Sequence, residues 1–216
     1  MNIIFLGPPG IGKGTHAEIV AKTYGIPRIA TGEILREEIK KGTKLGNEVK
    51  AYMEAGELVP DELVIDIIKK RISQKDCEKG FVLDGFPRTE MQAEELDRIT
   101  NIDLVLNLVA PHEVIIERIT GRLTCRKCGA IYHIKNIPPK REGVCDRCGG
   151  ELYRREDQSE KAVEKRLEIY EERTKPLIEY YRKKGILVEV NVEGEKDEVA
   201  ERIDKAIREF FERKGV

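Results

Sequence analysis

Residues 1–15, MNIIFLGPPGIGKGT, decide the fold, and the rest of the chain can be placed around them. The apolar run at 3–6 has the composition of a strand that is buried on both faces of a parallel sheet. Several glycines after it let the backbone turn so that N–H groups point inward, and a helix predicted at 13–22 adds the positive end of its dipole. Lys13 stands at the rim of this cradle. Such a cradle suits a polyphosphate, so we expect a nucleoside triphosphate to bind here.

The order of residues after Lys13 departs from the usual phosphate-binding pattern. That pattern has Ser or Thr directly after the lysine, whereas here Gly14 follows and Thr15 comes next. The hydroxyl of Thr15 can still turn toward a phosphate or Mg²⁺, so we interpret the departure as the mark of a subclass. A glycine-rich turn without a ligand is the alternative. The Gly-x-x-x-x-Gly-Lys pattern directly between a strand and a helix argues against it.

Composition narrows the classes of protein to which the chain can belong. Its 216 residues can hold one good-sized core with an insertion, and 37% of them are charged, with a net charge of −1. This balance gives no overall field that would recruit nucleic acid or a membrane surface, so we expect neither as a partner. The sequence has no apolar span of about 18 residues, and no basic stretch precedes the run at 3–6, so a cytoplasmic protein is expected.

Apolar β-type runs alternate with amphipathic segments, which predicts an α/β fold with a central parallel sheet flanked by helices on both faces. Ligands in such sheets bind beyond the carboxyl ends of the strands, where Gly7 and Asp84 both lie. Two stretches, 31–73 and 122–158, interrupt the alternation, and we interpret both as excursions from the core. The predicted strands are 3–6, 28–29, 80–84, 103–109 and 186–190, and the predicted helices are 13–22, 31–41, 44–55, 61–73, 89–98, 111–121, 160–183 (kinked or broken at Pro176) and 196–213.

Two further motifs carry charged residues next to a helix start or a strand end. Thr31 is expected to cap a helix, and Arg36 lies one turn beyond it, within reach of an anion held near the helix start. The run FVLDGFPRT at 81–89 ends an apolar strand in Asp84, as in the second motif of phosphate-loop enzymes, where an aspartate handles Mg²⁺. Arg88 follows, close enough to contact a phosphate near that metal. An ordinary capped helix and a solvent-exposed turn are the alternatives for these motifs taken alone.

The chain resembles the adenylate kinase family through three motifs that occur in the family's order and spacing. They are Lys13-Gly14-Thr15, Thr31-Gly32 with Arg36, and Asp84-Gly85-Phe86-Pro87-Arg88-Thr89. The similarity continues through Asp61-Glu62-Leu63-Val64, Gly121-Arg122 and the segment that bears Arg166, so it covers nearly the whole chain. His16 stands where many members have Gln, and Glu33 where Asp is frequent. We expect neither of these two residues to touch the chemistry.

This resemblance implies a P-loop nucleoside monophosphate kinase fold with two insertions. The core would comprise 1–30, 60–121 and 159–216, a helical AMP-binding domain would lie at 31–59, and a zinc-containing lid at 122–158. The implied reaction is reversible: ATP and AMP give two ADP, with Mg²⁺ accompanying ATP. The expected partners are therefore ATP, AMP and ADP, with no nucleic acid and no membrane, and the protein is expected to be a monomer.

The same resemblance implies the residues of the site, and the Phe86–Pro87 bond is expected to be cis. Arg154 adjoins Arg155, so the choice of Arg155 rests on its spacing to Arg166 and Asp157. The implied ATP-binding residues are Gly10, Ile11, Gly12, Lys13, Gly14, Thr15, Arg118, Arg122, Ile131 and Tyr132. The implied AMP-binding residues are Thr31, Arg36, Glu57, Leu58, Val59, Gly85, Phe86, Pro87, Arg88, Gln92, Arg155 and Arg166. The implied catalytic residues are Lys13, Asp84, Arg88, Arg122, Arg155 and Arg166.

Four cysteines form two Cys-x-x-Cys pairs, Cys125 with Cys128 and Cys145 with Cys148. This is the two-knuckle spacing of a zinc site. Four protein thiolates complete a tetrahedron, so the metal is predicted to be structural and to staple a segment with too little apolar content to form its own core. Two disulfides are the alternative, which a reducing cytosol disfavours.

Two other functions are alternatives to the adenylate kinase interpretation. The first is another nucleoside monophosphate kinase, acting on UMP or CMP or using GTP as donor. Thr31 favours AMP, because the pyrimidine kinases of this superfamily tend to carry Ala there, and a long lid favours the adenylate type. The second is a zinc-ribbon module that binds nucleic acid or protein, with the phosphate loop as a switch. The near-neutral net charge and the arginines outside the ribbon argue against it.

Overall fold

The fold is built on a five-stranded parallel sheet with the strand order β2-β3-β1-β4-β8. The computed structural model describes residues 1–155 and 160–215. β1 (Asn2–Leu6) lies at the centre, between β3 (Phe81–Asp84) and β4 (Leu104–Val109). β2 (Arg28–Ala30) and β8 (Leu187–Asn191) form the two edges. The α/β fold predicted from the alternation of runs is confirmed.

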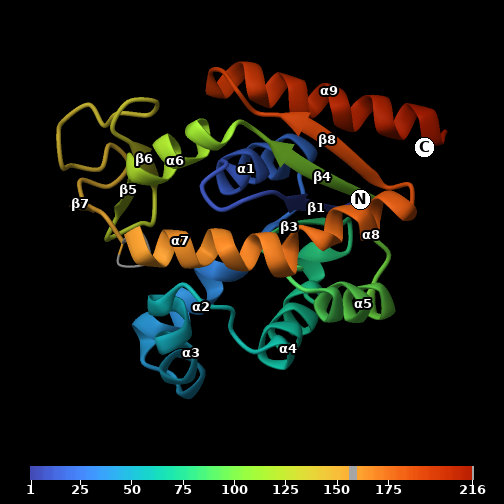
Figure 1. The fold of residues 1–216 in the computed structure, drawn as a ribbon, viewed down its shortest axis with the longest axis horizontal. Helices are drawn as coiled ribbons and strands as arrows, with labels where there is room; N and C mark the ends of the chain where they lie inside the picture. The colour runs from blue at the N-terminus through green and yellow to red at the C-terminus, as the bar shows by residue number, and fades with distance from the viewer. Residues whose placement is uncertain (156–159, 216) are drawn as a thin grey trace.

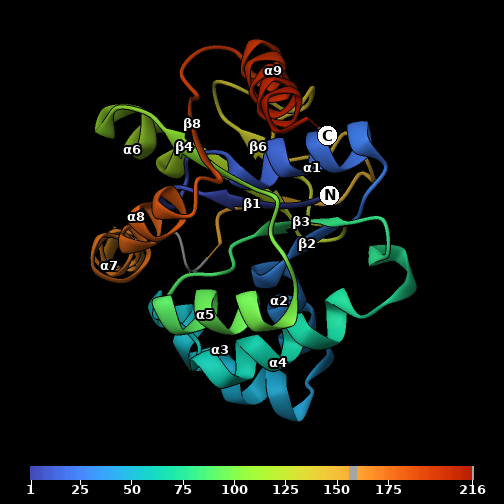
Figure 2. The ribbon, with the colours of Figure 1, turned by 90° about the vertical axis from the view of Figure 1, so that its right-hand side faces the viewer.

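Helices cover both faces of the sheet, and successive residues of β1 contribute to opposite faces. Ile3 and Phe5 belong to a core shared with α1 (Lys13–Tyr24), α6 (His112–Thr120) and α9 (Lys196–Lys214). Ile4 and Leu6 belong to a second core, shared with α4 (Asp61–Ile72), α5 (Glu90–Ile99) and α8 (Pro176–Lys183). Figure 2 shows α1 and α9 above the sheet, with α4 and α5 below it. Burial on both faces explains why β1 is a continuous apolar run rather than an alternating one.

The first excursion connects β2 to β3 through helices alone. α2 (Thr31–Lys41) and α3 (Lys44–Ala55) project from the sheet, followed by α4 and a short 3₁₀ turn at Lys75–Cys77. The end of α3 reaches α7 (Glu160–Ile169), which runs across the molecule in Figure 1. At this contact a Cβ atom on Gly56 would lie 2.8 Å from the carbonyl oxygen of Ala162. The two segments therefore approach as closely as a glycine permits.

The second excursion forms a small antiparallel sheet of its own, with the strand order β6-β5-β7. Its strands are β5 (Arg122–Cys125), β6 (Ile131–His133) and β7 (Leu152–Tyr153), and it lies at the left of Figure 1. We call the described part, residues 122–155, the lid. The predicted boundary at 158/159 lies outside the described residues. The buried apolar residues of the lid form one small cluster: Cys125, Ala130, Tyr132, Cys145 and Leu152.

The segment after the lid is helical but interrupted, as its proline predicts. α7 passes into a π-helical turn at Tyr170–Thr174, in which the N–H of Lys175 donates to the carbonyl of Tyr170 at 2.8 Å. Pro176 then begins α8, because it has no N–H to continue the preceding ladder and is tolerated in a first turn. The helix predicted at 196–213 is present as α9, and its buried apolar residues pack on the sheet: Val199, Ile203, Ile207 and Phe210. Within the described part of the chain, no helix combines the length and apolarity that crossing a bilayer requires.

Candidate active site

The phosphate loop, residues 7–12, joins β1 to α1 at the carboxyl edge of the sheet. Gly10 and Gly12 have φ values of 82° and 104°, a conformation that residues with a Cβ atom adopt at a cost. A Cβ atom on Gly10 would also lie 2.1 Å from Cγ1 of Ile119 in α6, whereas one on Gly12 would find its nearest atom at 3.5 Å. Packing and conformation both demand glycine at position 10, and conformation alone demands it at position 12.

The ammonium group of Lys13 folds back onto this loop. Its Nζ donates to the carbonyl oxygens of Gly7 at 2.6 Å and Pro8 at 2.7 Å. Burial lowers the pKa of Lys13 to about 7; Asp84 acts in the opposite direction, and three nearby guanidinium groups lower the pKa further. The site thus gathers more positive charge than its own carboxylates offset, which is the electrostatic condition for holding a polyphosphate.

A cavity of about 430 Å³ lies against the phosphate loop, with walls from the core, the lid, α2 and α7. It brings together residues that the sequence separates by more than a hundred positions. The predicted site residues that line it are Gly10, Gly12, Lys13, Gly14, Thr15, Arg36, Leu58, Asp84, Gly85, Pro87, Arg88, Arg118, Arg122, Ile131, Tyr132, Arg155 and Arg166.

A second cavity of about 70 Å³ shares part of its wall with the first. Four arginines line both cavities: Arg36, Arg88, Arg155 and Arg166. The smaller cavity also takes in the predicted residues Thr31, Glu57, Val59 and Gln92. Two predicted residues, Ile11 and Phe86, line neither cavity, and both have buried side chains. Ile11 takes part through its backbone, since its carbonyl accepts a hydrogen bond from Nη1 of Arg118 at 2.9 Å.

Thr31 does not cap α2, contrary to the sequence interpretation. It is the first residue of the helix, and the residue before it makes no side-chain capping bond. Its Oγ1 atom is instead buried, with no hydrogen-bond partner among the described residues. Leaving a buried hydroxyl unsatisfied costs free energy, so a ligand in the smaller cavity would gain by supplying the missing bond.

Gln92 is held in a fixed orientation by Asp61, a contact that the sequence analysis did not anticipate. Its Nε2 donates to Oδ1 of Asp61 at 2.7 Å, and its Oε1 accepts from the backbone N–H of Arg88 at 2.8 Å. Thr89 donates to the other oxygen of Asp61 at 2.9 Å. The two contacts fix which end of the Gln92 amide is the donor and which is the acceptor.

The structure separates the two adjacent arginines near the end of the lid. Arg155 is buried and lines both cavities, whereas Arg154 is exposed and lines neither. Asp157, whose spacing entered the prediction, lies outside the described residues. The Phe86–Pro87 peptide bond is cis, as expected.

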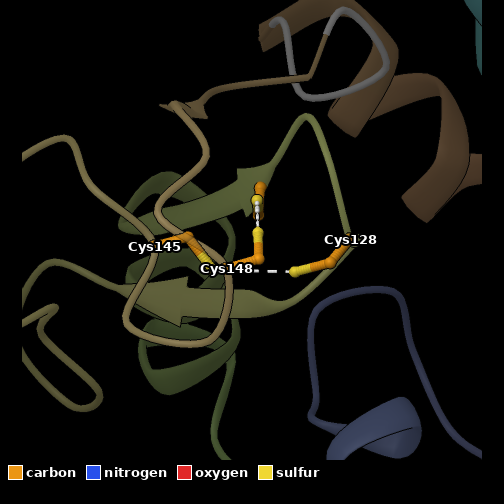
Figure 3. Close-up of side chains that lie close together, drawn as sticks. Cys128, Cys145 and Cys148 are labelled. Carbon is orange, nitrogen blue, oxygen red and sulfur yellow. Dashed lines mark hydrogen bonds between the residues drawn. The ribbon is translucent and has the colours of Figure 1, made fainter.

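The four lid cysteines form one cluster. Their Sγ atoms all lie within 4.8 Å of one another, with 3.5 Å between Cys125 and Cys148 and 3.6 Å between Cys128 and Cys145. Figure 3 shows the labelled side chains pointing toward one another between the loops and strands of the lid. Tetrahedral thiolates about 2.3 Å from one ion stand about 3.8 Å apart, so the donor set fits a zinc-type metal.

Ionisation of these thiols also fits a metal site. Burial raises the pKa of Cys145, but hydrogen bonds from Tyr132 and from the backbone N–H groups of Cys148 and Arg147 outweigh it and lower the pKa to about 6. The backbone N–H of Ala130 lowers the pKa of Cys128, yet burial and the neighbouring sulfur atoms raise it to about 12. Four thiolates at this spacing repel one another, so a cation is needed for all four to ionise together.

Comparison with known proteins decides the family. A family model described as adenylate kinase matches residues 5–186. The chain belongs to the adenylate kinase family. It is 57% identical to the adenylate kinase of Archaeoglobus fulgidus over 202 residues, which is 91% of this chain and 92% of that relative. It is 53% identical to the adenylate kinase of Methanosarcina acetivorans over 215 residues (97% and 100%), and 55% identical to that of Caldicellulosiruptor saccharolyticus over 193 residues (87% and 90%).

Membership of the adenylate kinase family confirms the fold and the class of function predicted from the sequence: the protein is a nucleoside monophosphate kinase, a transferase. Its active site nevertheless contains a residue that the sequence analysis missed. Arg28, at the start of β2, pairs with Asp84 and Glu33 and lines the larger cavity. Glu33, which we expected to stay away from the chemistry, lies on the same wall, as does His16.

Proposed function

We propose that this kinase transfers the terminal phosphoryl group of ATP to AMP, reversibly, giving two molecules of ADP. The observation that carries the proposal is that the two cavities share part of their wall. Four arginines of this wall line both cavities: Arg36, Arg88, Arg155 and Arg166. A phosphoryl group passing between two nucleotides carries negative charge on its three equatorial oxygens, so cations between donor and acceptor stabilise its transfer.

The donor nucleotide is assigned to the larger cavity. The N–H groups of residues 10–15 and the positive end of α1 bind the outer phosphates. On nucleotide binding, Lys13 exchanges the carbonyl oxygens of Gly7 and Pro8 for phosphate oxygens. The negative charge of the phosphates stabilises the ammonium form of Lys13, which burial disfavours. Four further lining residues, from α6 and the lid, are assigned to the rest of ATP: Arg118, Arg122, Ile131 and Tyr132.

The acceptor AMP is assigned to the smaller cavity. The buried hydroxyl of Thr31 and the oriented amide of Gln92 supply hydrogen-bonding groups to its nucleoside. Arg36 and Arg88 are assigned to its phosphate, which places that phosphate at the shared wall. The remaining residues assigned to AMP binding are Glu57, Leu58, Val59, Gly85, Pro87, Arg155 and Arg166, which line the cavities, and Phe86, which is buried beside Gly85 and Pro87 and lines neither cavity.

The protein then catalyses the transfer by positioning the two nucleotides and by neutralising the negative charge of the transferred group. An oxygen of the AMP phosphate attacks the terminal phosphorus of ATP, and the bond to the bridging oxygen of the departing ADP breaks. A phosphate nucleophile needs no general base, so the contribution of the protein is a set of cations around the transferred group. Mg²⁺ bound with ATP supplies further neutralisation of phosphate charge, and Asp84 offers a carboxylate on the cavity wall that fits its water shell. The assigned cations are Lys13, Arg88, Arg122, Arg155 and Arg166.

The division into domains belongs to the same proposal: a core of 1–30, 60–121 and 159–216, an AMP-binding domain of 31–59 and a lid of 122–158. Because both insertions contribute walls to the cavities, their closure over bound nucleotides excludes water that would otherwise accept the phosphoryl group. We assign a structural zinc ion to Cys125, Cys128, Cys145 and Cys148, whose thiolates fill all four positions. The enzyme is proposed to act as a cytoplasmic monomer.

The test is phosphoryl transfer from ATP to AMP, CMP, UMP and GMP at matched concentrations. We expect AMP to be the preferred acceptor, and substitution of GTP for ATP tests the donor. Gln92→Ala should raise the KM for AMP and leave that for ATP unchanged, whereas Gln74→Ala, on an exposed turn, should change neither. Preference for a pyrimidine monophosphate, or no transfer to any acceptor, would overturn the proposal.

A further inference from the structure

Arg28 joins two carboxylates that come from different parts of the chain. Its Nη2 atom lies 2.9 Å from Oδ2 of Asp84, at the end of β3, and 2.7 Å from Oε1 of Glu33, in the first turn of α2. The side chains of Arg28 and Asp84 are only 16% and 14% exposed, so water screens this pair weakly. One guanidinium group therefore neutralises part of the negative charge of two carboxylates.

This ion pair lies directly against the first turn of α1, which follows the phosphate loop. A Cβ atom on Gly14 would lie 3.1 Å from both Nη2 of Arg28 and Oδ2 of Asp84. The glycine that follows Lys13 thus leaves room for the pair. All four residues line the larger cavity, so the charge of Arg28 lies where the phosphates of the donor nucleotide are assigned.

Structural support alone does not account for this arrangement of Arg28. Its Nε atom is buried and has no hydrogen-bond partner in the described part of the chain. An arginine placed only for stability would gain by satisfying that N–H, because a buried unpaired donor costs free energy. The side chain is instead committed through its terminal nitrogens to the two carboxylates that face the cavity.

We propose that Arg28 sets how strongly the donor site depends on a divalent cation accompanying its nucleotide, by shielding Asp84 and Glu33 from the phosphates. The inference rests on the proposed function of this site. Without the positive charge of Arg28, the two carboxylates repel a metal-free polyphosphate and attract one that carries a cation. Two unit charges about 6 Å apart, at an effective dielectric constant of about 40, change an equilibrium constant by about tenfold.

The experiment is calorimetric titration with ATP, without AMP, in metal-depleted buffer and again with saturating Mg²⁺. The readout is the ratio of the Kd for metal-free ATP to the Kd for Mg-ATP. Arg28→Gln and Arg28→Met should raise this ratio about tenfold relative to the wild type. Arg28→Lys, which keeps the charge, should stay within about twofold of the wild type. The matched control is Arg71→Gln, which removes the same charge from a pair with Asp76 and lines neither cavity, and it should leave the ratio unchanged.

The outcomes separate the inference from the function on which it rests. A lower melting temperature with an unchanged ratio in Arg28→Gln and Arg28→Met would assign Arg28 a structural role only and overturn the inference. An equal rise in Arg71→Gln would trace the effect to net charge and overturn it too. A wild-type protein that bound ATP neither with nor without Mg²⁺ would overturn the proposed function itself.

Discussion

Gly10→Ala should destabilise the protein more than Gly12→Ala, although both residues have a positive φ. The left-handed conformation costs an alanine about 1–2 kcal/mol at either position. At Gly10 the new methyl group would also lie 2.1 Å from Cγ1 of the buried Ile119, and overpacking of this kind costs about 1–3 kcal/mol more. We therefore expect the free energy of unfolding to fall by about 2–5 kcal/mol for Gly10→Ala.

Thermal and urea unfolding of the nucleotide-free protein measure this difference. For a chain of this length, 1 kcal/mol shifts the Tm by about 2–4 °C, so Gly10→Ala should melt roughly 10 °C below the wild type and Gly12→Ala about 5 °C below it. Urea unfolding provides the free energies without relying on a transition at high temperature.

A double-mutant cycle isolates the packing contribution. Ile119→Ala alone should cost about 2–5 kcal/mol, because it leaves a cavity in the core. In the Gly10→Ala background the same truncation removes Cγ1, the atom that the new methyl meets, so the double variant should be about 1–3 kcal/mol more stable than the sum of the single effects. Additive effects, or equal losses for Gly10→Ala and Gly12→Ala, would refute the argument.

Four further predictions concern the charges of the active site and the cysteine cluster of the lid. At pH 8, a pKa of about 7 leaves Lys13 mostly deprotonated, so ATP binding should take up about one proton, which calorimetry in buffers of different ionisation enthalpy detects. The stability of the nucleotide-free protein should also rise between pH 7 and 10.5, because over that window the unfolded chain binds more protons than the folded one; a Lys13→Met variant without this rise is the control. Chelation of the metal proposed for the lid, or Cys145→Ser, should abolish the protection of β5–β7 against amide exchange and leave that of the central sheet, and parallel loss in both sheets would contradict a local role. Arg88→Ala should lower kcat by about 10²-fold, and near-wild-type rates at saturating substrate would exclude its assignment.

The features that the sequence predicts well depend on local spacing. The phosphate loop needs glycines and a lysine between one strand and one helix, and the cysteine cluster needs two Cys-x-x-Cys turns. Both lie within short segments, so their residues identify them before any fold is known. Each apolar run is likewise visible within a short segment, and the alternation of these runs with amphipathic segments predicts the parallel sheet.

The features that the sequence analysis missed depend on contacts between distant segments. Arg28 meets Asp84 across a separation of 56 residues, and Gln92 meets Asp61 across 31. The residue type of Thr31 predicts a helix cap, whereas its hydroxyl is buried at the smaller cavity. One signal is present in the sequence: Gly14, in place of the usual Ser or Thr, marks a position where another group has to fit against the first turn of α1.

The contact between Gly56 and α7 limits how closely the end of α3 can approach α7. With a carbonyl oxygen 2.8 Å from where a Cβ atom would lie, even a methyl group would hold the end of α3 away from α7. This contact therefore sets the closest approach of the first excursion, residues 31–73, to α7. The same helix carries Arg166, which lines both cavities. Under the proposed function, this backbone contact limits how closely the AMP-binding segment can close on α7, and it does so more sharply than a contact between flexible side chains would.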